Sequence, residues 1–106
     1  MLDQLTYDDF KDYRGKAFDL HGSGGRVEIT LLDARLSPYL RTSLVRRQPF
    51  AILFAAPREP ALGSTLYTIA HPGRGLIEGI FLSPVVPPEE DIERTRHLRF
   101  YEAVFN

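Results

Sequence analysis

Three histidines and a few carboxylates are the residues of this chain that could do acid–base or metal chemistry. His21, His71 and His97 each stand near the end of a strand-like run, and no short spacing relates any two of them. A metal site needs two or more converging ligands, so this pattern predicts no metal site. His71 directly precedes Pro72, and we expect it to serve in a turn or in packing rather than as a ligand or base.

Three acidic residues, Asp33, Glu78 and Glu102, fall within strand-like runs. Two carboxylates that meet across a sheet could form a glycosidase-like pair. Each could equally be the outward polar position of an alternating strand, or a charge that protects a strand edge from aggregation, and we favour these structural roles. A hydrolase that pairs His71 with one of the carboxylates is a further alternative, but no Ser or Cys nucleophile motif accompanies it.

The glycine-rich residues 22–25 (Gly-Ser-Gly-Gly) predict a hairpin turn rather than a phosphate-binding loop. The Lys-Ser/Thr that follows a phosphate loop is missing, and the run opens a strand instead of a helix. The chain has no cysteine, which excludes disulfides, thiol catalysis and thiolate metal ligands. We therefore predict no catalytic residue, no metal and no cofactor.

The composition predicts one globular domain over residues 1–106. Thirteen Lys and Arg against fourteen Asp and Glu leave a net charge of −1, so no global field attracts nucleic acid or an anionic membrane. No signal peptide is recognisable, and no apolar run approaches the roughly 20 residues of a membrane span. We expect a cytoplasmic protein, with export as part of a larger particle as the alternative.

The elements that would position these side chains begin with a short N-terminal helix. Thr6 and Asp9 have the spacing of a capping box, and Leu5 and Phe10 stand at the two positions of a hydrophobic staple. Together with Tyr13, the two staple residues would form an apolar face that closes one end of a sheet structure.

Strand-like runs separated by Gly and Pro turns make up the rest of the chain. They cover residues 16–21, 26–36, 50–56, 65–71, 76–84 and 98 onward. Tyr101, Ala103 and Phe105 share one face of the last run. Six short strands and one helical turn predict an all-β fold, a small six-stranded antiparallel barrel or sandwich.

Two of these runs depart from simple alternation. Within residues 26–36 the apolar set moves from odd positions to Leu32, Ala34 and Leu36, which predicts a β-bulge. Residues 50–56 are apolar on both faces, which predicts a central strand that is covered on each side.

Two connections, residues 37–48 and 85–97, are longer than so small a domain requires, and such connections are often functional. The first carries Tyr39, Leu40, Arg41, Leu44, Arg46 and Arg47, and the second carries Glu89, Glu90 and Asp91. Apolar side chains beside arginines match the composition of protein interfaces. The acidic segment offers a complementary charge on a neighbouring copy or within the same chain. We predict that these residues bind a partner.

The leading hypothesis is therefore a non-enzymatic interaction or assembly module that docks onto another protein, or another copy, through its two long connections. This hypothesis includes no partner that is a nucleic acid, a membrane or a small molecule. The alternative is a barrel that binds a small apolar ligand in a pocket lined by Phe54, Tyr67, Phe81 and Tyr101.

Several local patterns together resemble a bacterial family of small proteins, family 6916 of domains of unknown function. The patterns are residues 5–10 (LTYDDF), 15–18 (GKAF), 49–54 (PFAILF), 67–72 (YTIAHP) with Gly75, and 101–106 (YEAVFN). The resemblance implies no catalytic residues. The resemblance also implies a loose association of the family with genes for phage-tail-collar-like proteins, and hence an accessory or structural role. The two long connections of this chain depart from the usual look of the family.

Overall fold

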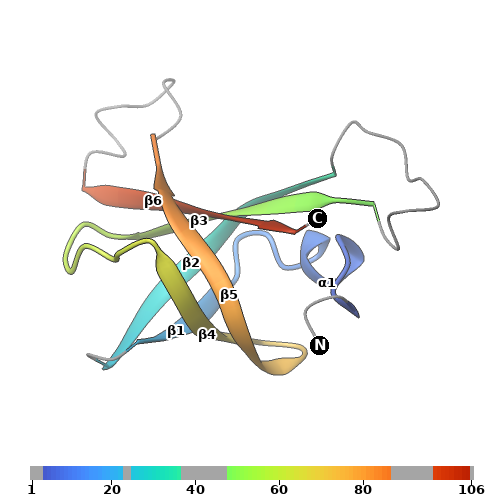
Figure 1. Cartoon of the computed structure of the whole chain (residues 1–106), viewed down its shortest axis with the longest axis horizontal. Coiled ribbons are helices and arrows are strands. Elements are labelled where there is room, and N and C mark those ends of the chain that lie inside the picture. Colours follow the sequence, from blue (N-terminus) through green and yellow to red (C-terminus); the bar gives the residue numbers. More distant parts are fainter. Residues whose placement is uncertain (1–3, 23–24, 37–47, 87–96, 106) are drawn as a thin grey trace.

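The computed structural model describes residues 4–22, 25–36, 48–86 and 97–105, which form a closed antiparallel barrel. Its elements are the helical turn α1 (Asp8–Lys11) and the strands β1 (Ala17–Gly22), β2 (Gly25–Leu36), β3 (Phe50–Pro57), β4 (Thr65–His71), β5 (Gly75–Val85) and β6 (Leu98–Phe105). Around the barrel the strands follow the order β1-β2-β3-β6-β5-β4 (Figure 1). The all-β prediction is confirmed, and of its two forms the barrel is the one observed.

The predicted bulge in β2 is present. The register of the β2–β3 pair shifts between Leu31 and Asp33, so Leu32 is the additional residue. The bulge lets β2 bend and pair with β1 along its first half and with β3 along its second half. Of the later apolar set only Ala34 is buried, whereas Leu32 and Leu36 are more than one third exposed. Leu32 and Leu36 therefore do not join Ala34 in the core.

Strand β3 lies between β2 and β6, but most of it is covered on one face only. Ile52 and Phe54 point into the barrel and are fully buried. On the outer face Ala51 and Leu53 are half-buried, and only Ala55 is buried. A single sheet that closes on itself has one interior and needs no second layer. The prediction that this strand is covered on both faces is therefore wrong for most of its length.

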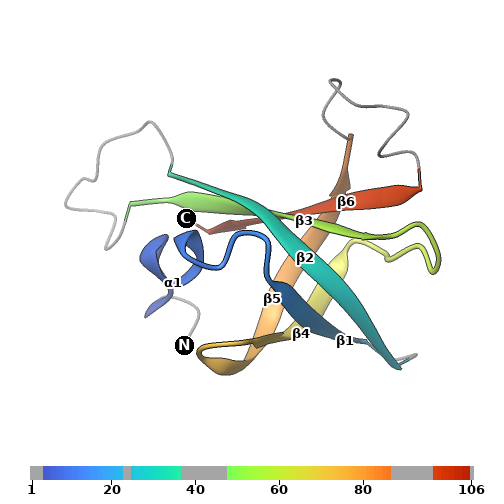
Figure 2. The same cartoon turned by 180° about the vertical axis from the view of Figure 1, so that it is seen from behind.

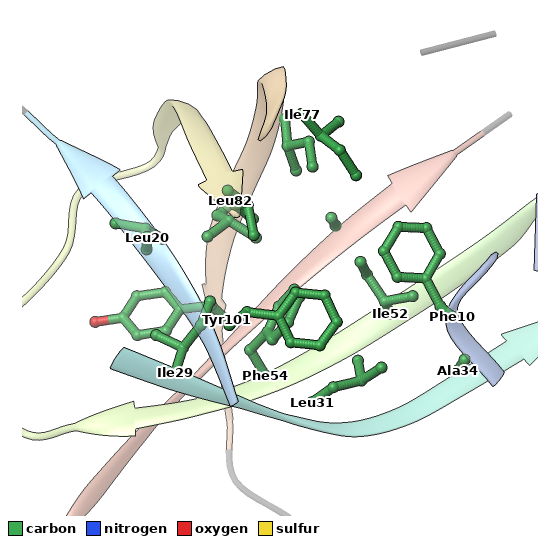
Figure 3. Packing of buried hydrophobic residues seen from close by; sticks show 14 of the residues in the cluster. Phe10, Leu20, Ile29, Leu31, Ala34, Ile52, Phe54, Ile77, Leu82 and Tyr101 are labelled. Atoms are coloured by element: carbon green, nitrogen blue, oxygen red, sulfur yellow. The ribbon is translucent and has the colours of Figure 1, made fainter. Parts of the chain in front are cut away.

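The N-terminal segment closes one end of the barrel, as its apolar face predicts (Figures 1 and 2). Leu5 and Phe10 are buried, and the ring of Phe10 lies 5.9 Å from that of Phe50 and 6.1 Å from that of Phe105. Tyr13 packs against the same core, which Figure 3 shows from close by. Within the described ranges, no helical segment has the length and apolar character needed to cross a bilayer.

The helix is shorter than its sequence pattern suggests, and its capping box is half formed. The Thr6 N–H donates to Oδ2 of Asp9 at 2.8 Å, but the helix is capped by Tyr7, whose side chain makes no capping hydrogen bond. Regular helix ends at Lys11, and the chain turns to a left-handed Gly15 before β1. Local capping alone therefore does not account for the position of the helix α1.

The opposite end of the barrel is partly covered by the segment that joins β3 to β4. The Leu62 N–H donates to the hydroxyl of Tyr101 at 3.0 Å, and the Tyr67 hydroxyl donates to the carbonyl of Gly63 at 2.9 Å. Leu62 and Tyr67 are partly buried against the core. Two polar contacts and two side chains thus seal this end more lightly than the aromatic cluster seals the other.

A side chain at Gly73, in the β4–β5 turn, would collide with Tyr13, because a Cβ built there overlaps the tyrosine hydroxyl. We expect Gly73→Ala to lower the free energy of unfolding in urea by about 1–3 kcal/mol. The control is Gly63→Ala, since a Cβ at Gly63 meets no heavy atom within 4 Å, and it should be neutral or slightly stabilising. An equal loss in both variants would contradict the close approach.

Candidate functional site

The residues expected to bind a partner all lie outside the described part of the chain. They are Tyr39, Leu40, Arg41, Leu44, Arg46, Arg47, Glu89, Glu90 and Asp91. The strands that flank the two connections are described. In the β3–β6 ladder Phe50 pairs with Phe105 and Pro57 pairs with Leu98, so the connections join the barrel at opposite ends of this ladder. At about 3.3 Å per residue, those ends are roughly 23 Å apart.

The outer surface of β4 and β5 exposes large apolar side chains. Leu66 pairs directly with Phe81, and these side chains are 62% and 52% exposed. Ala70 pairs with Leu76, which is 63% exposed. We call these four residues the β4–β5 apolar face. Exposed apolar side chains that adjoin one another, as those of Leu66 and Phe81 do, are common at interaction sites of proteins.

A second bulge produces this face. Tyr67 pairs with Ile80 but Ile69 pairs with Ile77, so β5 carries an additional residue next to Thr68. Gly79 accommodates it with a φ of +76°, a conformation that favours glycine. As a result Ile77, Ile80 and Leu82 are buried, whereas Leu76 and Phe81 point outward.

The pocket proposed for an apolar ligand is not assembled from its four predicted residues. Phe54 and Tyr101 are buried within the core, and Tyr67 lies at the barrel end. Phe81 lies on the outside because of the bulge in β5. The predicted lining is therefore not assembled in one place, and Tyr67 lines a different depression at the barrel end.

Two of the three strand carboxylates meet in a shallow groove on the outer wall, as the sequence allows. Asp33 and Glu102 each pair with Leu53 from opposite sides and line the same groove, whereas Glu78 lines a different one on β5. Arg35 Nε donates to Oδ2 of Asp33 at 2.8 Å, and Oδ1 accepts from the Ala34 N–H at 2.9 Å. The arginine and the main chain thus occupy the oxygens of Asp33.

The charges in this groove stabilise one another. The hydrogen bond to Asp33, together with the charge of that carboxylate, raises the pKa of the Arg35 guanidinium, and the charge of Glu102 adds to the effect. Arg14 lies 3.7 Å from Asp33 on the other side. An exposed cluster of this kind suits a structural role for the carboxylates better than an acid–base pair.

His71 lies in the barrel end beneath α1, and main-chain groups bind both of its ring nitrogens. The imidazole is 3% exposed. Nδ1 accepts from the N–H of Gly73 at 2.9 Å and from that of Arg74 at 3.1 Å. A ring nitrogen that accepts two N–H groups carries no proton, so Nε2 is the donor, and it donates to the carbonyl of Asp9 at 2.6 Å. The expected role in a turn and in packing is confirmed.

The surroundings of His71 hold the ring in place. Its centroid lies 4.5 Å from that of Tyr13, 5.1 Å from Phe18 and 5.3 Å from Phe10. Arg74 Nη1 adds an ion pair to Asp9 at 3.0 Å, next to the imidazole contact. Because both nitrogens are occupied and rings surround the imidazole, this arrangement leaves no position from which it could bind a substrate.

No metal-binding group is found within the described ranges, where no three His, Asp or Glu side chains converge. The described part of the chain thus defines a class of protein by its architecture: a small closed β-barrel with a helical plug and an apolar outer face. The family model for a domain of unknown function (DUF6916) matches residues 5–105. The chain belongs to this family, and the resemblance seen in its sequence patterns is confirmed at that level. No curated protein and no solved structure matches the chain.

Replacing His71 should weaken the attachment of α1 to the barrel. We expect His71→Leu to lower the free energy of unfolding by about 2–4 kcal/mol, because three part-buried main-chain groups lose their hydrogen bonds to the imidazole. Amide exchange of residues 8–13 should rise more than that of β3. The control is His21→Leu, a half-buried position on the outer wall, which should change stability by less than about 1 kcal/mol. Equal effects of the two substitutions would contradict this role of His71.

Proposed function

We propose that this protein is a non-enzymatic interaction or assembly module whose partner is another protein or another copy of the chain. The β4–β5 apolar face carries the proposal. Burial of its large exposed side chains against a partner would remove apolar surface from water, which is the main driving force of association. Both the imidazole of His71 and the carboxylate of Asp33 are occupied by structural contacts, which supports a role without catalysis.

The two long connections supply the second part of the proposal. One is basic and the other acidic, and the strands that flank them end on opposite sides of the β3–β6 ladder. Opposite charges at opposite ends suit a head-to-tail contact, in which Arg41, Arg46 and Arg47 of one copy meet Glu89, Glu90 and Asp91 of another. Such heterologous contacts build rings or filaments. Charge complementarity would select the register of this contact.

The setting that we propose is a multi-subunit bacterial assembly of the phage-tail kind. The loose association of the family with phage-tail-collar-like genes supports an accessory role there. A small barrel that carries a basic connection after one end of the β3–β6 ladder and an acidic connection at the other suits repeated contacts with neighbouring subunits.

Polar substitutions on the β4–β5 apolar face should abolish association without unfolding the barrel. In Leu66→Thr with Phe81→Thr, threonine keeps a high strand propensity while it removes the apolar contact. We expect at least a tenfold weaker self-association by light scattering, or the same loss of a captured partner, with an unchanged circular dichroism spectrum. The control is Leu32→Thr, which alters an exposed leucine on another strand. The use of this face would be refuted if the wild type is strictly monomeric and the double variant binds every partner as well as the wild type does.

Charge reversal in the basic connection tests the head-to-tail contact separately. We expect Leu44→Glu with Arg46→Glu to weaken association several-fold, and most strongly at low salt, because the contact with the acidic connection becomes repulsive. A Glu89→Arg, Glu90→Arg variant is then mixed with the Leu44→Glu, Arg46→Glu variant. If association is restored in the mixture, the acidic connection is the charged surface that the basic connection contacts. Association that is insensitive to both the reversal and salt would exclude the connections from the interface.

A further inference from the structure

The barrel end opposite α1 is hollowed, in contrast to the end that α1 fills. The β1–β2 hairpin and the segment that joins β3 to β4 lie on this side in both views (Figures 1 and 2). Between them is a depression of about 430 Å³. Its lining includes Leu20, Gly22, Arg26, Val27, Leu62 and Tyr67. The mouth of a β-barrel is a common place for small-ligand sites, and their volumes run from roughly 300 to 1,000 Å³.

The floor and walls of this depression are apolar. Leu20 points into the barrel and is fully buried, and Val27, its cross-strand partner, is half-buried. Leu62 and Tyr67 pack against the core from the opposite side and are also half-buried. A Cβ built at Gly22 would lie 3.6 Å from the Tyr67 ring, so the glycine leaves room beside the ring. An apolar group of a ligand could fill this room.

One cation stands at the rim. Arg26 follows the hairpin turn, and its side chain is 71% exposed. The carboxylate of Asp19 lies 3.8 Å from one of its terminal nitrogens, which is longer than a hydrogen bond. A guanidinium has five N–H donors arranged as a fork that matches a carboxylate. Arg26 is among the residues that line the depression and therefore retains the capacity to bind an anionic group at its edge.

We propose that this end of the barrel binds a small amphiphilic carboxylate. The carboxylate would bind Arg26 in a bidentate manner, and the hydrocarbon body would cover Leu20, Val27 and Leu62 beside the Tyr67 ring. None of the residues that line this depression belongs to the β4–β5 apolar face, so the site does not depend on the proposed function. It also differs from the pocket predicted from the sequence, because Phe54 and Phe81 take no part in it.

The test is a titration of the isotopically labelled protein with decanoate below its micellar concentration, followed by amide NMR. We expect saturable shifts at Gly22, Leu62 and Tyr67. Arg26→Gln should weaken binding about tenfold, as expected for loss of a charge-assisted hydrogen bond. Lys16→Gln, which removes the same charge at the other end of the barrel, should have no effect. Decanol, which lacks the charge, should bind the wild type as weakly as decanoate binds Arg26→Gln.

A second variant tests the apolar part of the site. The backbone of Gly22 needs no left-handed conformation, so Gly22→Leu can place a side chain against Tyr67 and fill the space. We expect it to weaken decanoate binding at least tenfold, whereas Ala17→Leu on the same strand leaves binding unchanged. Absence of saturable shifts, shifts centred on the β4–β5 apolar face, or equal affinity in Arg26→Gln and the wild type would overturn the proposal.

Discussion

One buried imidazole holds together the two parts of this fold. His71 ends β4 inside the barrel and bonds to the β4–β5 turn through one ring nitrogen and to α1 through the other. A helix of four residues is too short to be stable by itself, because few internal hydrogen bonds offset the cost of its nucleation. The helical turn α1 is therefore stable because its contacts with the barrel end hold it in place. In return it places Phe10 over Phe50 and Phe105 and completes the core.

Closure of the sheet also determines which surfaces are left for function. A barrel uses the inner face of every strand for its core, so its stability does not require apolar side chains outside. Leu66, Leu76 and Phe81 are nevertheless exposed on the outer wall, and the proposed interaction surface is built on them. The unequal sealing of the two barrel ends has a similar consequence. Rings fill the end beneath α1, whereas the other end keeps an apolar hollow with a guanidinium at its rim.

Much of the architecture can be read from alternation along the chain. Tyr101, Ala103 and Phe105 are buried as their spacing predicts, and the change of parity in β2 corresponds to a real bulge. The bulge in β5 does not follow from alternation, because Glu78 and Gly79 interrupt the apolar run and the sequence does not indicate on which side of them the parity changes. Alternation therefore wrongly predicts that Phe81 faces inward. A glycine after Glu78 within a strand is the one local signal that could have revealed this bulge.

The sequence by itself determined the approximate positions of the strands and of the helical turn, and the exclusion of thiol chemistry, because these follow from composition and from local periodicity. Only the tertiary structure decided that the sheet closes, that main-chain groups bind both nitrogens of His71, and that an apolar face lies outside on β4 and β5. These features depend on the register between segments far apart in the chain. A shift of one residue in that register moves a side chain from the core to the solvent.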